Sequence, residues 1–537
     1  MENSNFDVII LGTGLTESIV AAALSKWGFR IVHIDQNSYY GGGEASLTLE
    51  EFANWVDAHS TSSQRYSNAT RSDPVPAFAR QYSICLCPTI NPSLGPFIDA
   101  LIHSGVSKYS GFRLLERVAV YDGANAFKSV PGSKEDVFRN KDISLIQKRR
   151  LMRFLTFAAG DFEQSTELQG KHNLPFTDFL ESVFSLSKEL VAVIAYALAY
   201  SSSTTDPTIS VLPRIKRYLC SVGRYGSSPF LVGHYGGVGE ISQGFCRTAA
   251  VNGAVYILGR HITSISTNTD RVQSENPTPQ TDVATRPLRY SVVLEDIPEP
   301  LHANVILGPV AYVPPQIDSH SLRAVKPSSF QTAYSMKSVL RCVAIVEHPI
   351  ELRTPSHNPK RKEVNITDKN LDTAVMVFPP GSLDNGSSDS SVVVLMTGEG
   401  TLSAPKGKFI LYISLPVSNG TDLDPSQALR PYLDAILELG REEVREPLFT
   451  AFYTENLGEV PPNDGSQSQK KATWLVPPPV PLGPLGDVAD TATRNAETLF
   501  HEVLQALSDN GEKYSKDDAQ SGGIWPKTAV TENEDEE

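Results

Sequence analysis

Cysteine is scarce in this sequence. The 537 residues include five cysteines, an odd number, and all five fall within apolar or mixed segments. Small secreted proteins that depend on disulfides are much richer in cysteine and usually have an even number. We therefore expect free thiols and a reducing compartment. Cys85 and Cys87 have no second cysteine pair at the spacing of a zinc site, so we expect no bound metal.

Long apolar runs and an excess of positive charge are also absent. No stretch approaches the roughly 20 apolar residues that span a bilayer, and the N-terminus shows no basic or cleavable leader. The last residues, ENEDEE, contain no prenylation box. The formal net charge of −14 argues against nucleic acid or an anionic membrane as a general partner. We expect a cytosolic protein that handles lipid, if at all, as a soluble carrier.

The N-terminal segment has the pattern of a dinucleotide-binding βαβ unit. Phe6 to Leu11 is a short apolar run with β-branched residues, which predicts a strand buried on both faces of a parallel sheet. A glycine-containing turn leads into Leu15 to Lys26, a segment of good helix formers. A second strand is predicted from Arg30 to Ile34, and Asp35 follows it. This order of elements is typical of Rossmann-type proteins.

The glycine motif of this unit is degenerate. In G-x-G-x-x-G the second glycine lets a pyrophosphate approach the backbone, and the third allows close packing of the helix. Gly12 and Gly14 occupy the first two places, but Glu17 occupies the third. Its carboxylate would set negative charge beside the pyrophosphate, at a cost on the order of a few kcal/mol. We favour an empty site without a cofactor; in the alternative, an occupied one, Asp35 would meet a ribose hydroxyl.

A helical region follows. From Pro131 to about residue 218, apolar residues recur at helical spacing, with a basic cluster, Lys148 to Arg150, on the other side of one predicted helix. Ser133 to Asp136 resembles a capping box. Lys188 to Tyr200 is apolar almost all round, which indicates either a helix buried in a bundle or one that lines a cavity. An inserted helical domain fits this length.

Strand-like segments resume after residue 219. We predict strands at 255–258, 262–265, 290–294, 305–307, 339–346, 374–378, 392–396 and 409–415, and helices at 426–440 and 491–507. The polar segment Ser60 to Pro76 and the proline-rich segment Gln467 to Pro484 are predicted to be loops. The expected organisation is a discontinuous α/β domain, residues 1–132 and 219–507, an inserted helical domain, 133–218, and a disordered acidic tail, 508–537.

Two segments carry candidate contact residues. Tyr39 and Tyr40 precede three consecutive glycines, and aromatic residues in such a loop are typical of protein-contact surfaces, although either ring could instead pack beneath the loop. Glu240, Gln243 and Arg247 are spaced by three and four residues, so they would share one face of a helix. That face is either a solvated charged surface or a recognition surface.

Five sequence blocks resemble a known family. DVIILGTGLTES, HIDQNSYYGG, RRLMRFLTF, RYGSSPFL and YGGVGEISQGFCR are similar, in this order, to blocks of the family that contains the Rab GDP-dissociation inhibitors and the Rab escort proteins. The resemblance implies an α/β fold like that of FAD-binding proteins, with a Rossmann-type parallel sheet, an additional β-sheet and an inserted all-helical domain. It further implies that the protein functions without a bound flavin. It also implies a Rab-binding platform formed by Tyr40, Tyr235, Glu240, Gln243 and Arg247. The family's YGxGE is one residue longer here, which affects the placement of Tyr235.

Within this family, three features resemble the escort proteins. They are the length of the chain, the C-terminal NAETLFHEVL and the FLTF of the helical region. The resemblance implies that Phe157 anchors a prenyltransferase, with Lys171 as a candidate for the basic residue that follows this aromatic in the family. The alternative is that Phe157 belongs to the helical core.

The resemblance implies a binding role without catalytic residues. An escort protein is the accessory component of Rab geranylgeranyltransferase: it binds GDP-bound Rab, presents it to the α/β heterodimer and carries the prenylated Rab to membranes, which it touches transiently. We expect the geranylgeranyl chain to be covered near Lys188 to Tyr200, with about 0.8 kcal/mol gained for each buried methylene. One alternative is a Rab GDP-dissociation inhibitor, which recycles prenylated Rabs and would not use Phe157 to bind the transferase. The other is an FAD-dependent oxidoreductase, which a bound yellow flavin would reveal.

Overall fold

A computed structural model describes residues 4–61, 65–123, 126–130, 143–267, 289–314, 317, 322–327, 337–348, 350, 352, 371–417, 423–439, 446–458, 472–480, 482–483, 485–509 and 523–526. The predicted capping box at Ser133 to Asp136 lies outside these residues. So does most of the predicted acidic tail.

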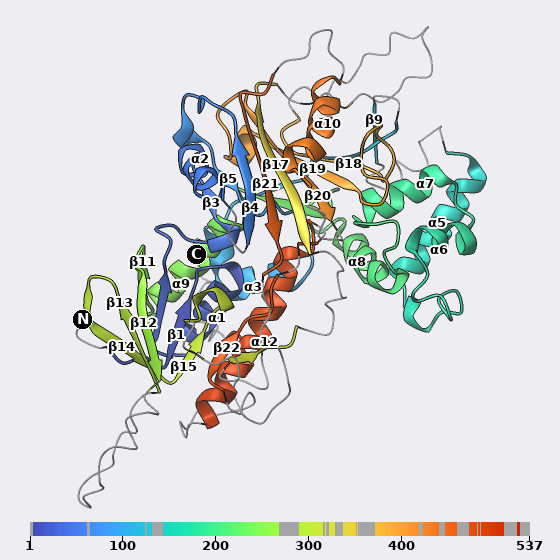
Figure 1. The fold of residues 1–537 in the computed structure, drawn as a ribbon. Coiled ribbons are helices and arrows are strands. Elements are labelled where there is room, and N and C mark those ends of the chain that lie inside the picture. Colours follow the sequence, from blue (N-terminus) through green and yellow to red (C-terminus); the bar gives the residue numbers. More distant parts are fainter. Residues whose placement is uncertain are drawn as a thin grey trace, which may run out of the picture.

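A six-stranded parallel sheet contains the N-terminal βαβ unit (Figure 1). In spatial order its strands are β11 (Val255–Leu258), β2 (Ile31–Asp35), β1 (Val8–Leu11), β15 (Val305–Leu307), β22 (Trp474–Val476) and β16 (Leu322–Ala324). Helix α1 (Leu15–Lys26) connects β1 and β2 and has the bounds that the sequence predicts. The predicted strand–helix–strand unit is confirmed.

Both faces of the parallel sheet are covered, which explains the continuous apolar sequence of β1. Val8 and Ile10 face a layer of helices, whereas Ile9 and Leu11 face a small antiparallel sheet. Successive side chains of a strand point to opposite faces, so all four residues must be apolar. The covering elements are α1, α3 (Pro96–Ser104), α9 (Val238–Val251) and α12 (Val488–Asp509) on one face, and β12 (Ile262–Thr267), β13 (Tyr290–Leu294) and β14 (Ile297–Ala303) on the other.

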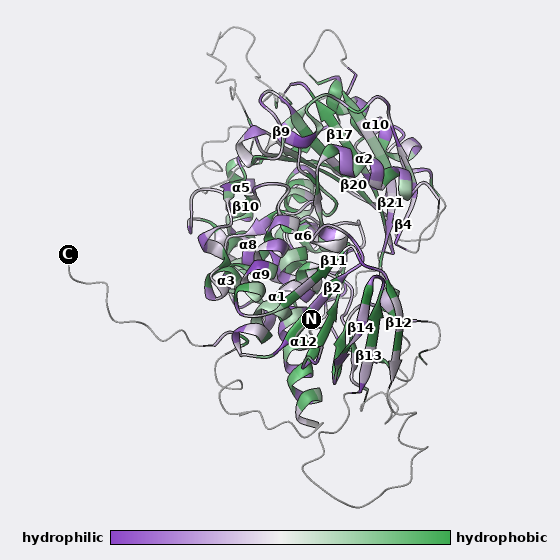
Figure 2. Cartoon of the chain, turned by 90° about the vertical axis from the view of Figure 1, so that its left-hand side faces the viewer, coloured by the Kyte–Doolittle hydropathy of each residue, from purple (hydrophilic) through white to green (hydrophobic). Residues whose placement is uncertain are grey.

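An eight-stranded sheet forms the other large layer, drawn above the parallel sheet in Figure 1. In spatial order its strands are β4 (Tyr66–Arg71), β21 (Phe449–Asn456), β17 (Ser338–Val346), β20 (Phe409–Val417), β19 (Val392–Thr397), β18 (Ala374–Phe378), β8 (Arg117–Tyr121) and β9 (Phe127–Ser129). Neighbouring strands are antiparallel except β18 and β8. Helix α10 (Pro425–Leu437) covers one face and α2 (Leu49–Ala58) part of the other. Figure 2 shows the strands of both large sheets as mainly apolar.

The longer regular elements described between β9 and β10 are helices. They are α5 (Leu145–Ala159), α6 (Phe176–Phe184), α7 (Lys188–Ala192), a π-helical turn (Val193–Leu198) and α8 (Thr208–Ser221). These helices lie beside the eight-stranded sheet (Figure 1) and share a hydrophobic core with it. The predicted fold class is confirmed: a Rossmann-type parallel sheet, additional β-sheet and an inserted helical region. Two short sheets complete the fold, β6 (Asn91–Pro92), β10 (Phe230–Gly233) and β7 (Phe112–Leu114) in one, and β3 (Ser46–Leu47) and β5 (Ile84–Cys85) in the other.

Two segments predicted to be loops contain strands. The segment Ser60 to Pro76 contains β4, an edge strand whose outward side chains are polar, so its composition resembles that of a loop. The segment Gln467 to Pro484 contains β22, which pairs on both sides within the parallel sheet. Its three residues are too few for a periodic pattern, and the flanking prolines suggested a loop.

Part of the predicted disordered tail is ordered. Ile524 is 3% exposed and joins the core between the parallel sheet and its helices. The Trp27 Nε1–H at the end of α1 donates to the Ile524 carbonyl oxygen at 2.9 Å. The ring of Trp525 stacks on Phe245 of α9, with 6.3 Å between centroids. The prediction of a disordered tail does not hold for this segment.

Among the described helices, none combines the length and apolar character that crossing a bilayer requires.

Candidate functional site

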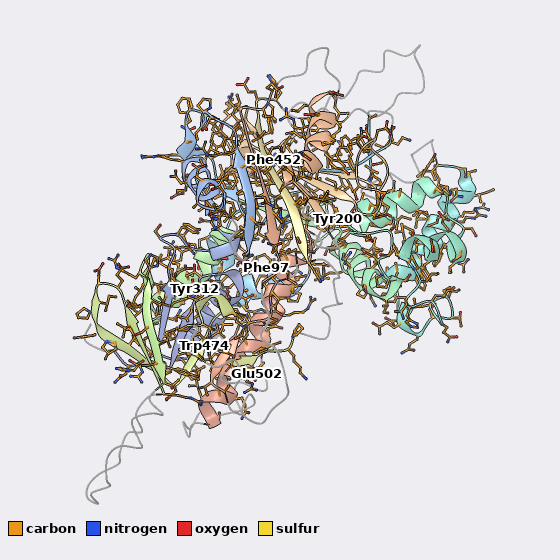
Figure 3. The ribbon with its side chains drawn as sticks, viewed as in Figure 1. Phe97, Tyr200, Tyr312, Phe452, Trp474 and Glu502 are labelled. Atoms are coloured by element: carbon orange, nitrogen blue, oxygen red, sulfur yellow. The ribbon has the colours of Figure 1, made fainter. Side chains whose placement is uncertain are left out.

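The turn after β1 is covered by a tyrosine of the protein itself. Gly12 has a φ of +86°, a conformation that glycine adopts without strain. The ring of Tyr312, in the short turn Val310–Tyr312, lies over it, because a Cβ built on Gly12 would be 3.5 Å from that ring. Figure 3 shows Tyr312 beside the strands of the parallel sheet.

Asp35, the acid at the end of β2, accepts hydrogen bonds on both carboxylate oxygens from groups of the protein itself. Its Oδ2 accepts hydrogen bonds from the Thr13 backbone N–H at 2.8 Å and the Thr13 hydroxyl at 2.6 Å. Its Oδ1 accepts from the backbone and side-chain N–H groups of Asn37, at 2.9 and 3.0 Å, and from the Tyr312 hydroxyl at 3.3 Å. A carboxylate has about four lone-pair sites, so five donors leave none for a ribose hydroxyl.

Two carboxyl groups meet above Gly14. Glu44 lies in the short helical turn Gly42–Glu44 and accepts a hydrogen bond from the Leu15 backbone N–H at 3.2 Å. It therefore occupies the anion position at the start of α1. A Cβ built on Gly14 would lie 2.6 Å from Glu17 Oε2 and 2.9 Å from Glu44 Oε2. The space through which a pyrophosphate would approach the second glycine is filled.

The two carboxyl groups of this crevice have different surroundings. Burial and then the neighbouring Glu44 raise the pKa of Glu17 from 4.5 to about 8, so Glu17 is protonated at neutral pH. This raised pKa runs against the expectation that Glu17 supplies the negative charge of the crevice. The Arg65 guanidinium lies 3.4 Å from Glu44 Oε1. The residues of the crevice do not fit a dinucleotide, so the flavin alternative has no site here.

The predicted contact residues of α9 form one exposed face. Glu240, Gln243 and Arg247 are all exposed, whereas the side chains on the opposite side of the helix are buried; we call these three residues the α9 face. Partial burial raises the pKa of Glu240. The three residues therefore share one face of the helix, as their spacing of three and four residues predicts. Whether a partner binds this face stays a prediction.

Tyr109 extends the α9 face and was not predicted. The Arg247 guanidinium lies over the Tyr109 ring, 5.3 Å from its centroid. The Tyr109 hydroxyl donates to the Gly244 carbonyl oxygen at 2.8 Å, and 46% of the residue is exposed. Tyr109 follows α3 in a stretch without any sequence motif, so nothing in the sequence pointed to it.

The loop that carries Tyr40 packs directly on α9. Tyr40 is half-buried, and its ring meets the Tyr256 ring edge-on at 6.0 Å. Tyr39 packs instead against the core beneath the eight-stranded sheet. A Cβ built on Gly41 would lie 3.3 Å from the Gly239 Cα, so glycine at this position lets the loop approach the backbone of α9 closely.

Tyr235 lies just before α9. It is exposed, has a φ of +52°, and its backbone N–H donates to the Thr401 carbonyl oxygen at 3.0 Å. Tyr235 thus contacts the turn that follows β19, next to the exposed Leu402. A non-glycine residue in this conformation is strained, which is common at functional sites. Its role in partner binding stays a prediction.

Phe157 belongs to an aromatic cluster and still reaches the surface in part. Its ring lies 5.2 Å from the ring of Phe184, 6.0 Å from Phe179 and 6.2 Å from Phe162. Phe157 is only partly buried, whereas Phe179 is fully buried. Lys171 donates through Nζ to the Glu167 carbonyl oxygen at 3.4 Å. The transferase-binding role of Phe157 stays a prediction.

The segment Lys188 to Tyr200 lies against the eight-stranded sheet. Its π-helical turn packs on β8 and β18, and its apolar residues join the core shared with the helices. Tyr200, labelled in Figure 3, lies where the helical region meets the sheet and has a φ of +50°. A π-helical turn is uncommon and often occurs at functional sites. The predicted lipid cover at this segment stays a prediction.

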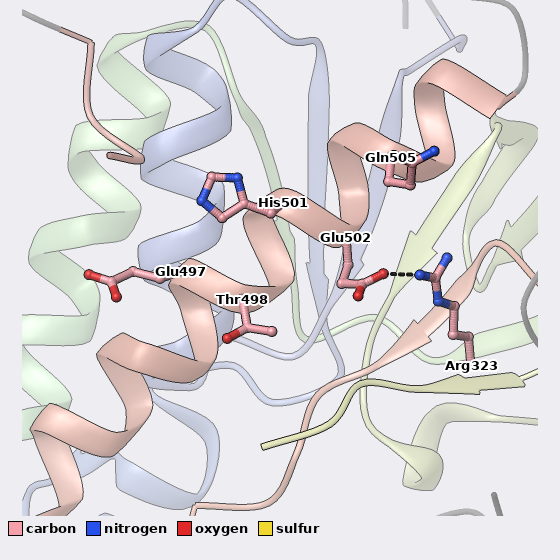
Figure 4. A pocket seen from close by; sticks show the side chains of 6 residues that line it. All are labelled: Arg323, Glu497, Thr498, His501, Glu502 and Gln505. Carbon is pink, nitrogen blue, oxygen red and sulfur yellow. Dashed lines mark hydrogen bonds and ion pairs between the residues drawn. The ribbon is translucent and has the colours of Figure 1, made fainter. Parts of the chain in front are cut away.

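A cavity of about 540 Å³ lies elsewhere, against α12 (Figure 4). Glu502 pairs with Arg323 across it. Its lining residues are Arg323, Glu497, Thr498, His501, Glu502 and Gln505. None of the predicted contact residues lines it. Within the described ranges, no group of three or more His, Cys, Asp or Glu residues is arranged to hold a metal ion.

Comparison with known proteins identifies similar sequences and folds. Residues 1–285 match a family model described as GDP dissociation inhibitor. The chain is 32% identical over 415 residues to a protein of Saccharomyces cerevisiae named Rab proteins geranylgeranyltransferase component A, covering 76% of this chain and 61% of that protein. This chain spans 42% to 61% of the length of four curated relatives.

Two solved structures share the fold. A Rab GDI from Plasmodium falciparum superimposes with a TM-score of 0.63 at 20% identity, covering 95% of this chain and 99% of that one. An oxidoreductase from Methanosarcina mazei superimposes with a TM-score of 0.55 at 12% identity, covering 92% of this chain and all of that one, 100%. At these identities the likeness concerns the fold alone.

Proposed function

This chain belongs to the GDP dissociation inhibitor family, and from that membership we propose that it is a Rab escort protein, the accessory component of Rab geranylgeranyltransferase. The observation that carries the proposal is the similarity to the yeast protein named component A of that transferase. In this role the chain binds GDP-bound Rab, presents its C-terminal tail to the catalytic heterodimer and covers the attached lipid.

The α9 face supports the Rab-binding part of the proposal. It combines an acidic, an amide and a basic side chain with Tyr109 beneath Arg247 and Tyr40 on the adjoining loop. Arg and Tyr, together with Trp, are the residues most enriched at the energetic centres of protein interfaces. Because Tyr109 holds the Arg247 guanidinium in place, less side-chain entropy is lost when a partner carboxylate binds it. Preference for GDP follows if the partner's switch segments must be mobile to fit this surface.

The helical region supports the transferase and lipid parts. Phe157 presents the edge of an aromatic cluster to the surface of α5, which suits an anchor for a second protein. The π-helical turn at Val193–Leu198 lies between the helices and the eight-stranded sheet. An isoprenoid chain held there would be covered by apolar side chains of the helices and the sheet, and each of its buried methylenes would gain about 0.8 kcal/mol.

Reconstituted prenylation tests the proposal. A GDP-loaded Rab, the catalytic heterodimer and geranylgeranyl diphosphate are combined with and without this chain, and lipid incorporation is measured. We expect incorporation only when the chain is present. Full replacement of the chain by a Rab GDP-dissociation inhibitor would contradict the proposal and favour the dissociation-inhibitor alternative.

A matched pair of arginine variants links the activity to the α9 face. Arg247→Ala should weaken binding of GDP-loaded Rab by about 5-fold to 150-fold, since an interface arginine of this kind contributes on the order of 1 to 3 kcal/mol. Arg80→Ala removes an exposed arginine on a different element and should leave Rab binding unchanged. Equal effects of the two substitutions would contradict the assignment of this face.

A further inference from the structure

Tyr256 joins the turn after β1 to the loop that carries Tyr40. It lies on β11, next to β2, where its hydroxyl is 3.2 Å from His33 Nδ1. Its ring meets the Tyr40 ring edge-on at 6.0 Å and lies 5.0 Å from the His33 ring. Tyr256 also lies near Cys246, the residue that precedes Arg247 on α9, close enough for the thiol to affect the pKa of the tyrosine hydroxyl. Tyr256 thus contacts Tyr40 directly and reaches the turn after β1 through His33.

The hydrogen-bonding direction of this chain of groups can be assigned. His33 is completely buried, and its Nε2 lies 2.5 Å from the Gly12 carbonyl oxygen. A carbonyl oxygen only accepts, so Nε2 carries the proton. Burial lowers the pKa of His33 to about 4, so the ring is neutral and Nδ1 has a free lone pair. The Tyr256 hydroxyl must therefore donate to Nδ1.

This arrangement fixes Tyr256 in one orientation. If its hydroxyl were removed, His33 Nδ1 would remain without a donor inside the protein, which is costly. The turn at Gly12 is rigid in its own right, because Thr13 is held to Asp35 by two hydrogen bonds. The glycine turn of a dinucleotide fold is therefore connected to Tyr40 through two hydrogen bonds, Gly12 to His33 and His33 to Tyr256, and one ring contact, Tyr256 to Tyr40.

We propose that His33 and Tyr256 are positioning residues for Rab recognition: the carbonyl of Gly12 orients His33, His33 orients Tyr256, and Tyr256 holds the Tyr40 ring against α9. The inference rests on the proposed function, since Tyr40 is taken to contact Rab. Neither His33 nor Tyr256 touches the partner. Their effect on binding passes through the ring of Tyr40.

A double-mutant cycle on GDP-loaded Rab binding tests this. Tyr256→Phe keeps the ring and removes the donor, and we expect it to weaken Rab binding about fivefold. His33→Gln should have an effect of the same size. In a Tyr40→Ala background both substitutions should have almost no further effect, because the ring that they position is gone. Equal weakening by Tyr256→Phe in the wild-type and Tyr40→Ala backgrounds would overturn the proposal.

Tyr290→Phe is the matched control. It removes another buried tyrosine hydroxyl, bonded to the Thr473 side chain at 3.2 Å, on a sheet that lies across from α9. It should leave Rab affinity unchanged. A loss of affinity as large as that of Tyr256→Phe would show that removing any buried tyrosine hydroxyl weakens binding by destabilising the protein, and would overturn the proposal.

A second readout separates this inference from the proposed function. Fluorotyrosine at position 40 reports the ring environment by fluorine NMR without any Rab present. We expect Tyr256→Phe to shift and broaden this resonance and Tyr290→Phe to leave it in place. If the unsubstituted protein did not bind Rab, the proposed function would fail while this measurement still decided whether Tyr256 holds Tyr40. An unchanged resonance in Tyr256→Phe would refute the positioning itself.

Discussion

Gly239, in the first turn of α9, lies in backbone contact with Ser46: a Cβ built on Gly239 would stand 2.3 Å from the Ser46 backbone nitrogen. Ser46 begins β3, directly after the loop that carries Tyr40 and Glu44. The start of α9 and this loop therefore form one unit. The contact links the filled crevice to the α9 face and requires glycine at position 239.

Gly239→Ala should damage this unit. The added methyl group cannot fit without separating the two backbones, and overpacking of this kind costs about 1 to 3 kcal/mol of the free energy of unfolding. We expect lower stability in urea denaturation and weaker binding of GDP-loaded Rab. Gly160→Ala is the control, since a Cβ there would meet only ordinary contacts at 3.4 and 3.6 Å. If both variants unfolded at the urea concentration of the wild type, the backbone contact would be without energetic importance.

The raised pKa of Glu17 makes a prediction about pH. The unfolded chain loses this proton near pH 4.5, whereas the folded chain keeps it until about pH 8. Between these values the folded state binds more protons, so this group lowers the free energy of unfolding as the pH rises. Glu17→Gln, which mimics the neutral acid, should match the wild type near pH 5 and exceed its stability at pH 8, by on the order of a few kcal/mol.

Urea denaturation of both proteins at several pH values measures this difference. Glu163→Gln, at an exposed carboxyl group in the helical region, serves as the control and should follow the wild type at every pH. A Glu17→Gln difference that stayed constant from pH 5 to pH 8 would show that the fold does not raise the pKa of Glu17.

Much of the fold could be predicted because its strands are defined locally. The bounds of α1, β11, β13, β15 and β18 agree with the sequence prediction to the residue. Buried strands and helices of this kind have continuous or periodic apolar sequences. The edge strand β4 and the short strand β22 depend on partners that are distant in the sequence, so their own residues carry little signal.

Some residues of the candidate site could likewise be predicted from the sequence, and others could not. Glu240, Gln243 and Arg247 share one helix, so their spacing alone places them on one face. Tyr109, Glu44 and Tyr312 reach the site from elements far apart in the sequence, and only the folded chain brings them there. The raised pKa of Glu17 could not be predicted, because burial, its main cause, and the nearby Glu44 both depend on the folded chain.

Phe157 can be tested against a neighbour in the same cluster. Phe157→Ala should weaken binding to the transferase heterodimer and also lower the stability of the helical region, since its ring packs on three other phenylalanines. Phe179→Ala removes a fully buried ring from the same cluster and should lower stability without a direct effect on the surface. Transferase affinity and thermal unfolding are measured for both. Equal losses of affinity at equal losses of stability would assign Phe157 to the core.

The ordered segment near the end of the chain should stabilise α9. Trp525 stacks on Phe245, and Ile524 fills the core between α1 and α9, so the segment ties together the two helices that border the crevice. Trp525→Ala should lower the free energy of unfolding by about 1 to 3 kcal/mol, less than a fully buried tryptophan would, because the ring is only partly buried. It should also speed amide hydrogen exchange in α9, since the helix loses one of its packing partners.

Tyr225→Ala removes an aromatic residue that is 51% exposed and should change stability by less than about 0.5 kcal/mol. Deletion of residues 523–537 should lower stability more than Trp525→Ala does, because it also removes Ile524 from the core. A shortened chain with unchanged exchange in α9 would show that the segment lies on the helix without stabilising it.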